Sequence, residues 1–201
     1  MNRLLRVLLG VVLVFSAGLI QAAPKPGAMA PDFTATDTQG NTVTLSKLQG
    51  QYVVLEWTNH LCPFVQKHYG SGNMQALQKT YTDKGYRWYS IVSSAPGKQG
   101  NIDAAKANEL TTSRGAAPSG VILDPSGAIG KLYDARTTPH MFILDPSGKL
   151  VYMGGIDSIP SADKGDLEAA TNYVQAAFAE LEAGKPVSTP VSAPYGCSVK
   201  Y

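Results

Sequence analysis

The stretch NHLCPFVQKH at 59–68 contains the residues of this chain that are best suited to chemistry. Its cysteine, Cys62, lies between His60 and His68, and the 201-residue chain has one other cysteine, Cys197. A cysteine thiolate is both a nucleophile and a metal ligand, and a neighbouring histidine can tune its pKa. Thiol redox chemistry and metal binding are therefore both open, beside the simpler hypothesis that the two cysteines form a structural disulfide.

The residues around Cys62 favour a reactive thiol over a packed one. The apolar run YVVLEW at 52–57 predicts a strand buried on both faces, and Pro63 is typical of the first position of a helix. Cys62 then lies at or beside the N-cap, where free amide protons and the helix dipole favour the thiolate. Buried cysteines often only fill space, but Asn59 and His60 are poor core neighbours. We therefore predict a redox-active Cys62.

A metal site would draw its ligands from one cysteine and three histidines, which suit copper or zinc. These candidate ligands are His60, Cys62, His68 and His140. No pair of them has the spacing of a zinc finger. We therefore expect no metal and no other cofactor, and a copper-binding module is the weaker alternative.

The hydrophobic pattern predicts strands that alternate with helices and then a closing hairpin and helix. This order indicates an α/β fold with a mixed central sheet flanked by helices, in which sites gather at the carboxyl ends of strands. Cys62 lies at such an end. The predicted elements are hairpins at 33–50 and 141–154, strands at 52–57, 86–94 and 120–123, and helices at 63–81 with a break at 70–72, at 101–115 and at 166–186.

The two ends of the chain are expected to lie outside this domain. Arg3 and Arg6 precede an apolar run at 8–20, and Ala22 and Ala23 follow it, which is the pattern of a secretory signal peptide cleaved near Ala22 or Ala23. The run is shorter than the roughly 20 residues of a membrane-spanning helix, so we expect export to the periplasm or another extracytoplasmic space, without stable membrane insertion. The predicted division is a signal peptide at 1–23, a domain at 24–185 and an extended tail at 186–201 that carries Cys197.

The charge of the chain excludes one class of partner. The sequence has 17 basic and 15 acidic residues, and without Arg3 and Arg6 of the leader it has 15 of each. Nucleic-acid binding needs a surplus of basic side chains gathered on one face. We therefore expect no nucleic-acid partner.

Two stretches of the sequence resemble a known family. APDFTATDTQGNTVTLSKLQGQYVVLEWTNHLCPFV at 30–65 and TTPHMFILDPSGKLVYMGG at 137–155 are similar to the redoxin family, the alkyl hydroperoxide reductase and thiol-specific antioxidant branch of the thioredoxin fold. The resemblance runs from about 30 to 159. It implies a thioredoxin-like fold with an N-terminal β-hairpin, and it implies that Thr138 and Pro139 form a cis-proline site that faces Cys62.

Within this family, the sequence CPFV and the terminal GCSVK are most similar to a peroxiredoxin-like subgroup with a single active-site cysteine. Val65 stands where thioredoxins have the second cysteine of Cys-x-x-Cys. The resemblance implies peroxide reduction, an antioxidant activity, in which the Cys62 thiolate attacks the O–O bond and becomes a sulfenic acid. Cys197 could resolve it, since the 12 residues from Lys185 span up to roughly 40 Å when extended, within one chain or across a homodimer.

The sequence departs from peroxiredoxins beside the cysteine. Those enzymes have Thr or Ser three residues before it and Pro four residues earlier still, whereas this chain has Asn59 and Leu55. Thr58 is one place off, and Asn59 could still donate a hydrogen bond to an oxygen. Arg136, just before the cis-proline site, is our candidate to hold a thiolate or a peroxide.

Thiol–disulfide exchange is the alternative activity. Cys62 would attack the disulfide of a partner protein, and Cys197 or an external thiol would release the mixed disulfide. An exposed Cys62 beside a cis-proline loop favours this reaction, and the missing second cysteine counts against it. We rank peroxide reduction slightly ahead, and both reactions need an external thiol reductant.

Overall fold

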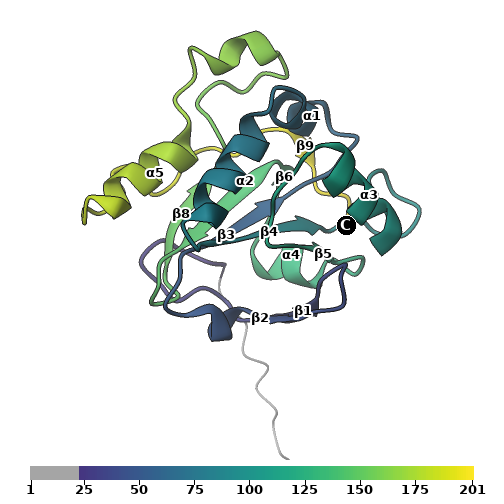
Figure 1. Cartoon of the computed structure of the whole chain (residues 1–201), viewed down its shortest axis with the longest axis horizontal. Coiled ribbons are helices and arrows are strands. Elements are labelled where there is room, and N and C mark those ends of the chain that lie inside the picture. Colours follow the sequence, from purple (N-terminus) through teal and green to yellow (C-terminus); the bar gives the residue numbers. More distant parts are fainter. Residues whose placement is uncertain (1–22) are drawn as a thin grey trace, which may run out of the picture.

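The structure is a computed structural model that describes residues 23–201 (Figure 1). The predicted signal peptide at 1–23 lies outside this range apart from Ala23. Within the described range, no helix has the length and apolar character needed to cross a membrane.

The described chain alternates strands and helices before a final segment with little regular structure. The strands are β1 (Thr34–Thr36), β2 (Thr42–Thr44), β3 (Val53–Trp57), β4 (Arg87–Val92), β5 (Gly120–Leu123), β6 (Thr137–Thr138), β7 (His140–Leu144), β8 (Leu150–Gly154) and β9 (Cys197–Ser198). The helices are α1 (Pro63–Gly70), α2 (Asn73–Asp83), α3 (Ala104–Ser113), α4 (Ala128–Leu132) and α5 (Tyr173–Glu182), with 3-10 turns η1 (Leu45–Leu48) and η2 (Lys164–Leu167).

A mixed sheet of five strands forms the centre of the domain, in the order β5-β4-β3-β7-β8. The first three of these strands are parallel, whereas β7 is antiparallel to β3 and β8 is antiparallel to β7. Every residue of β3 is buried, as its continuous apolar run predicted for a strand covered on both faces. The predicted α/β fold with a mixed central sheet is confirmed.

The two faces of the sheet have different covers (Figure 1). Helices α1, α2, α3 and α5 lie on one face, and the β1–β2 hairpin and α4 lie on the other. Successive side chains of β3 point to opposite faces, so Val54 packs in one core with Phe178 of α5, while Leu55 packs in the other with Phe33.

The predicted break in the helix after β3 is confirmed. Helix α1 ends at Gly70, and α2 begins at Asn73 after Gly72, whose φ is 80°. This left-handed conformation favours glycine because a Cβ would be strained there. The break lets α1 and α2 change direction while both stay on the same face of the sheet.

The last helix is shorter than the sequence pattern predicted. We expected it at 166–186, but it begins at Tyr173, because the side chain of Asn172 caps it by accepting a hydrogen bond from the Gln175 amide at 3.1 Å. The residues before it form η2 instead. Elements α4, β6 and β9 were not predicted, since such short elements leave no periodic pattern.

A buried carboxyl group links α1 and α2 to the sheet. Glu56 of β3 is fully buried and accepts four hydrogen bonds. The donors are the Tyr69 hydroxyl at 2.9 Å, Gln78 Nε2 at 3.1 Å, Trp88 Nε1 at 2.9 Å and the Ser90 hydroxyl at 3.0 Å. Burial raises the pKa of Glu56, and these hydrogen bonds offset only part of that effect. These hydrogen bonds hold α1, α2 and β4 against the end of β3.

Replacing Glu56 by leucine should destabilise the fold far more than replacing it by glutamine. Leucine leaves the Trp88 indole N–H and the Ser90 hydroxyl without an acceptor, whereas the glutamine oxygen can still accept from them. Because each unsatisfied buried group costs about 1–3 kcal/mol, the free energy of unfolding of Glu56→Leu should lie about 3 kcal/mol below that of Glu56→Gln. Urea denaturation measures this difference, and equal stabilities would contradict it.

A comparison of the wild type with Glu56→Gln should also reveal the sign of a pH dependence of stability. The folded pKa of Glu56 is raised above its ordinary value of 4.5. Its contribution to stability is then fully present below that ordinary value and is lost as the pH rises through the folded pKa. The stability of the wild type relative to Glu56→Gln should therefore fall as the pH rises from about 4. A relative stability that grows with pH would contradict the burial effect.

Candidate active site

Cys62 lies at the N-cap of α1, as predicted from the strand before it and the proline after it. Pro63 is the first helical residue, and the Cys62 amide donates to the Asn59 carbonyl at 3.0 Å. The expectation of an exposed thiol is wrong, because Cys62 is 0% exposed and belongs to the core under α1. Local sequence could not predict this burial, since the covering segment comes from the far end of the chain.

The Cys62 thiol contacts the backbone just before the predicted cis-proline. It donates a hydrogen bond to the carbonyl oxygen of Thr138 at 3.1 Å. The Thr138–Pro139 peptide bond is cis, and Thr138 is buried in β6. The sequence therefore correctly predicted both the cis-proline and its position facing the cysteine.

The carboxyl-terminal tail brings the second cysteine to the same place. Strand β9 pairs antiparallel with β6, and Cys197 lies opposite Thr138 in this pairing. Gly196 makes the close approach possible, because a Cβ at that position would lie 2.1 Å from the Thr138 carbonyl oxygen. The tail is docked on the cis-proline segment through this pairing. Both cysteines are free thiols.

The two thiols differ in acidity. Burial acts to raise the pKa of Cys62, but hydrogen bonds from the Cys197 side chain, the backbone amides of Val65 and Cys197, and the Thr138 side chain outweigh it and lower that pKa. Burial and the adjacent Cys62 raise the pKa of Cys197 to about 11, with a small opposing effect of Lys200. Cys62 is therefore the more acidic thiol of the pair and the better suited to attack as a thiolate.

A buried polar cluster holds the tail beside Cys197. Asp157 is 2% exposed and accepts hydrogen bonds from Lys67 Nζ, at 3.2 Å, and from the Tyr195 hydroxyl. The same hydroxyl lies 3.2 Å from His68 Nε2. Tyr195 precedes Cys197 by two residues, so these contacts fix the backbone that leads into β9.

The polar residues just before Cys62 take different roles from those that a peroxide site would need. The Asn59 side chain accepts from the Leu61 amide at 3.0 Å and donates to the Gln99 carbonyl at 3.2 Å, so it shapes the loop. The Thr58 hydroxyl is buried without a hydrogen-bond partner among residues 23–201 and lines a pocket between α3 and the sheet.

Arg136 has a partner away from the cysteines. Its guanidinium donates to Asp134 at 3.0 Å from Nε and 2.5 Å from a terminal nitrogen, and its side chain is 71% exposed. Within the described residues, its guanidinium makes no hydrogen bond to either cysteine. The structure therefore does not bring Arg136 to the thiol.

The histidines considered as metal ligands are dispersed. His68 contacts Tyr195, His140 Nδ1 accepts a hydrogen bond from the Arg136 amide at 3.3 Å, and His60 lines the same pocket as Thr58. Burial lowers the pKa of His68 and of His140 to about 4. In the part of the chain that the structure describes, no group of three or more His, Cys, Asp or Glu side chains is arranged to hold a metal ion.

Sequence reasoning missed the residues that dock the tail. Gly196 and Tyr195 immediately precede Cys197 in a segment of small and polar residues, and this pairing of glycine and an aromatic residue was the available signal. Lys67 and Asp157 left no local signal, because they are 90 residues apart and meet only in the folded chain.

Tyr195→Phe should make Cys197 more reactive. The change removes the hydroxyl that Asp157 and His68 share, which should cost about 1–2 kcal/mol of tail docking and expose Cys197 roughly tenfold more often. The rate of Cys197 modification by a thiol reagent, followed by peptide mapping, measures this. Tyr86→Phe is the matched control, since its hydroxyl contacts Glu182, away from the tail. Equal modification rates in the wild type and in Tyr195→Phe would contradict the role of the Tyr195 hydroxyl in docking the tail.

Comparisons with known proteins agree with this architecture. Among solved structures, an uncharacterized conserved protein from Geobacillus kaustophilus is 26% identical with a TM-score of 0.73, over 88% of this chain and 92% of that chain. A hypothetical protein from Sinorhizobium meliloti 1021 is 23% identical with a TM-score of 0.73, over 90% of this chain and 96% of that chain. A candidate protein disulfide isomerase from Bacteroides thetaiotaomicron is 26% identical with a TM-score of 0.52, over 65% and 78%.

The family assignment rests on the sequence of the domain. A search of curated proteins found no match. Residues 26–153 match the AhpC/TSA family, a range that includes Cys62 and Pro139 and ends before the tail that carries Cys197. Since this match covers more than half of the chain and the fold is thioredoxin-like, the protein belongs to the AhpC/TSA family of thioredoxin-like redox proteins.

Proposed function

We propose that this protein is a thiol–disulfide oxidoreductase whose working pair is Cys62 and Cys197. One observation carries the proposal: both cysteines meet at Thr138, one through its thiol and the other through strand pairing. The tail thereby supplies the second thiol that Val65 cannot supply. The likeness to a candidate protein disulfide isomerase supports the same reaction class.

The first step is attack by Cys62. Its thiolate attacks one sulfur of a substrate disulfide, so a mixed disulfide forms on Cys62 and the other substrate sulfur leaves as a thiolate. The lowered pKa of Cys62 supports this role, because the thiolate is the attacking form. The position at the N-terminus of α1 stabilises the same charge.

The second step is resolution by Cys197. Its thiol loses a proton and attacks the Cys62 sulfur, so a Cys62–Cys197 disulfide forms and the second substrate thiolate leaves. The substrate gains two electrons and, with two protons from the medium, becomes two thiols, while the protein is oxidised by the same two electrons. An external dithiol reductant, by the reverse exchange, returns the pair to thiols.

Access to Cys62 requires the tail to move. The thiol is fully buried, and β9 pairs with β6 through only two residues on each strand. A pairing this short is easily opened compared with the central sheet. We infer that substrate disulfides approach Cys62 when β9 separates from β6, and that closure of β9 delivers Cys197 for the second step.

The residues nominated for a peroxide do not favour the peroxidase reaction. Thr58 lines a separate pocket, Asn59 bonds within its loop, and Arg136 pairs with Asp134. Of the three, only the Thr58 hydroxyl has no partner within residues 23–201, and the pocket that it lines does not include Cys62. This is why we place disulfide exchange ahead of peroxide reduction, the reverse of the order suggested by the sequence.

Peroxide reduction remains the second candidate because of one observation, the complete burial of Cys62. A small oxidant can reach a covered thiolate with less opening of the tail than a protein disulfide needs. In that reaction the Cys62 thiolate attacks the distal oxygen of ROOH, the O–O bond breaks, and Cys62 becomes a sulfenic acid while the alkoxide leaves and takes up a proton to form ROH. Cys197 then attacks the sulfenic sulfur, so that the disulfide forms and water leaves. The signal-peptide pattern at 1–23 supports an extracytoplasmic site of action for either reaction.

Intact-mass measurements on the reduced mature protein test the proposal. With oxidised glutathione, the wild type should lose two hydrogens and contain a Cys62–Cys197 bridge on peptide mapping. Cys197→Ser should stop at a mixed disulfide between Cys62 and glutathione, because no resolving thiol is present. Cys62→Ser should form neither this mixed disulfide nor the bridge. Alkylation of the reduced wild type, followed by peptide mapping, should also show a lower midpoint pH for Cys62 than for Cys197.

Hydrogen peroxide at the same concentration separates the two candidates. Disulfide exchange predicts faster bridge formation with oxidised glutathione than with peroxide. Fast sulfenic acid formation on Cys62 of Cys197→Ser, together with no mixed disulfide, would instead establish peroxide reduction. If Cys62→Ser forms a Cys197–Cys197 disulfide between two chains as fast as the wild type forms its bridge, the assigned Cys62–Cys197 pair is overturned.

A further inference from the structure

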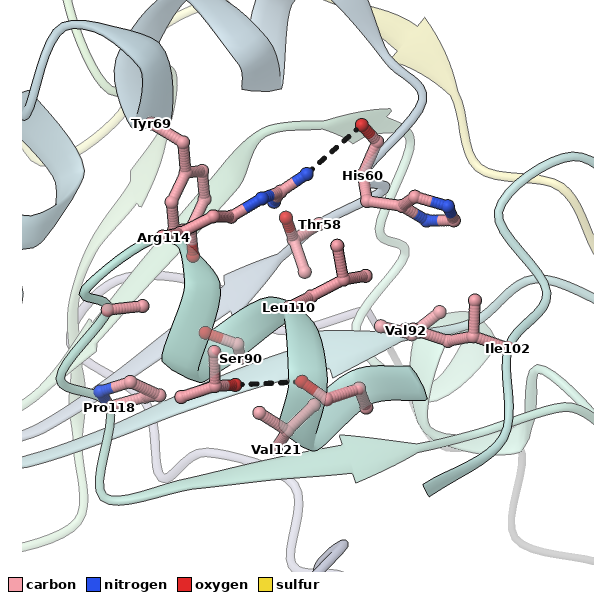
Figure 2. A pocket seen from close by; sticks show the side chains of 13 residues that line it. Thr58, His60, Tyr69, Ser90, Val92, Ile102, Leu110, Arg114, Pro118 and Val121 are labelled. Atoms are coloured by element: carbon pink, nitrogen blue, oxygen red, sulfur yellow. Dashed lines mark hydrogen bonds between the residues drawn. The ribbon is translucent and has the colours of Figure 1, made fainter. Parts of the chain in front are cut away.

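A pocket separate from the two cysteines lies between α3 and strands β4 and β5 (Figure 2). Its cavity volume is about 40 Å³ and it is open to solvent, and neither Cys62 nor Cys197 lines it. Most of its wall is aliphatic. The aliphatic side chains include Val92, Ile102, Ala107, Leu110 and Val121.

One end of this pocket is polar and positively charged (Figure 2). The Arg114 guanidinium lies over the Tyr69 ring, 4.9 Å from its centroid, and donates one hydrogen bond to the His60 carbonyl at 3.3 Å. No carboxylate among residues 23–201 forms an ion pair with it. A half-buried guanidinium therefore has most of its donors free at the mouth of an aliphatic pocket.

Two further polar atoms at this end have no partner. The hydroxyl oxygen of Thr58 and Nδ1 of His60 are both buried and make no hydrogen bond within the described chain. Buried polar atoms without partners are costly, so a ligand that hydrogen-bonds to them would be favoured. Figure 2 places Thr58 and the His60 carbonyl beside Arg114, whereas the His60 ring points away from the guanidinium.

The surroundings repel cations and attract anions. A neighbouring groove shares Tyr69 and Arg114 with the pocket and is also lined by Lys67 and Lys164. Lys67 is neutralised by Asp157, whereas Lys164 donates only to the Gly70 carbonyl at 2.9 Å. No acidic residue lines either the pocket or the groove.

We propose that this pocket binds a compact monocarboxylate with an aliphatic body. The carboxylate would pair with the Arg114 guanidinium, whose planar fork matches two carboxylate oxygens, and would accept a hydrogen bond from the Thr58 hydroxyl. The aliphatic body would replace water against the walls formed by α3, β4 and β5. The site lies on the segment between β3 and α1 that ends in Cys62, yet its ligand does not depend on the thiol chemistry.

Titration of the full mature chain with propanoate, followed through the NMR chemical shifts of the chain, tests this site, with propanol as the uncharged match. One propanoate should bind per chain, and propanol should bind at least about tenfold more weakly, because a hydrogen bond to a charged group contributes about 1.5–3 kcal/mol. Arg114→Gln should weaken propanoate binding by a similar factor. Arg87→Gln is the matched control, since Arg87 is exposed at the start of β4 and bonds to Gln51.

Two variants probe the pocket itself. Ala107→Leu fills the aliphatic space and should abolish binding, and Thr58→Val removes the unpartnered hydroxyl at nearly constant volume and should weaken it severalfold. Circular dichroism checks that each variant is folded. If Ala107→Leu does not fold, Thr58→Val alone still tests whether the pocket binds the carboxylate. The proposal fails where propanoate does not bind, where propanol binds equally well, or where Arg114→Gln and Thr58→Val both bind like the wild type.

Discussion

The pairing of β9 with β6 is the contact on which the candidate site depends. It sets Cys197 opposite Thr138, whose carbonyl oxygen accepts the hydrogen bond of the Cys62 thiol. Two paired residues cannot hold a strand in place alone, and the hydroxyls of Tyr195 and Tyr201 anchor the chain on either side of it. The site is therefore made by the tail as much as by the thioredoxin-like domain.

The domain and the tail together supply the chemical asymmetry of the pair. Strand β3 ends in the loop that puts Cys62 at the N-terminus of α1, and hydrogen bonds from the Cys197 side chain and from the Val65 and Cys197 amides lower the pKa of Cys62 despite burial. Burial and the neighbouring Cys62 raise the pKa of Cys197. One thiol is thus prepared to attack and the other to remain protonated until it is needed.

The same loop separates two kinds of surface. Its first residues, Thr58 and His60, line the pocket under α3, and its last residue, Cys62, lies under the tail. Redox chemistry and the binding of a small anion would therefore use opposite sides of one short segment. Glu56, just before it, fixes the end of β3 through its four buried hydrogen bonds, so both sides are built on a rigid strand.

The sequence alone determined the mixed α/β fold, the break between α1 and α2, the position of Cys62 at the helix start and the cis-proline before His140. Each of these follows from local periodicity, from helix-start signals or from a family motif. Only the tertiary structure decided that Cys62 is buried, that Arg136 turns to Asp134 and that Cys197 meets Thr138. These contacts join segments that are far apart in the chain, and their free energy depends on packing that no local pattern encodes.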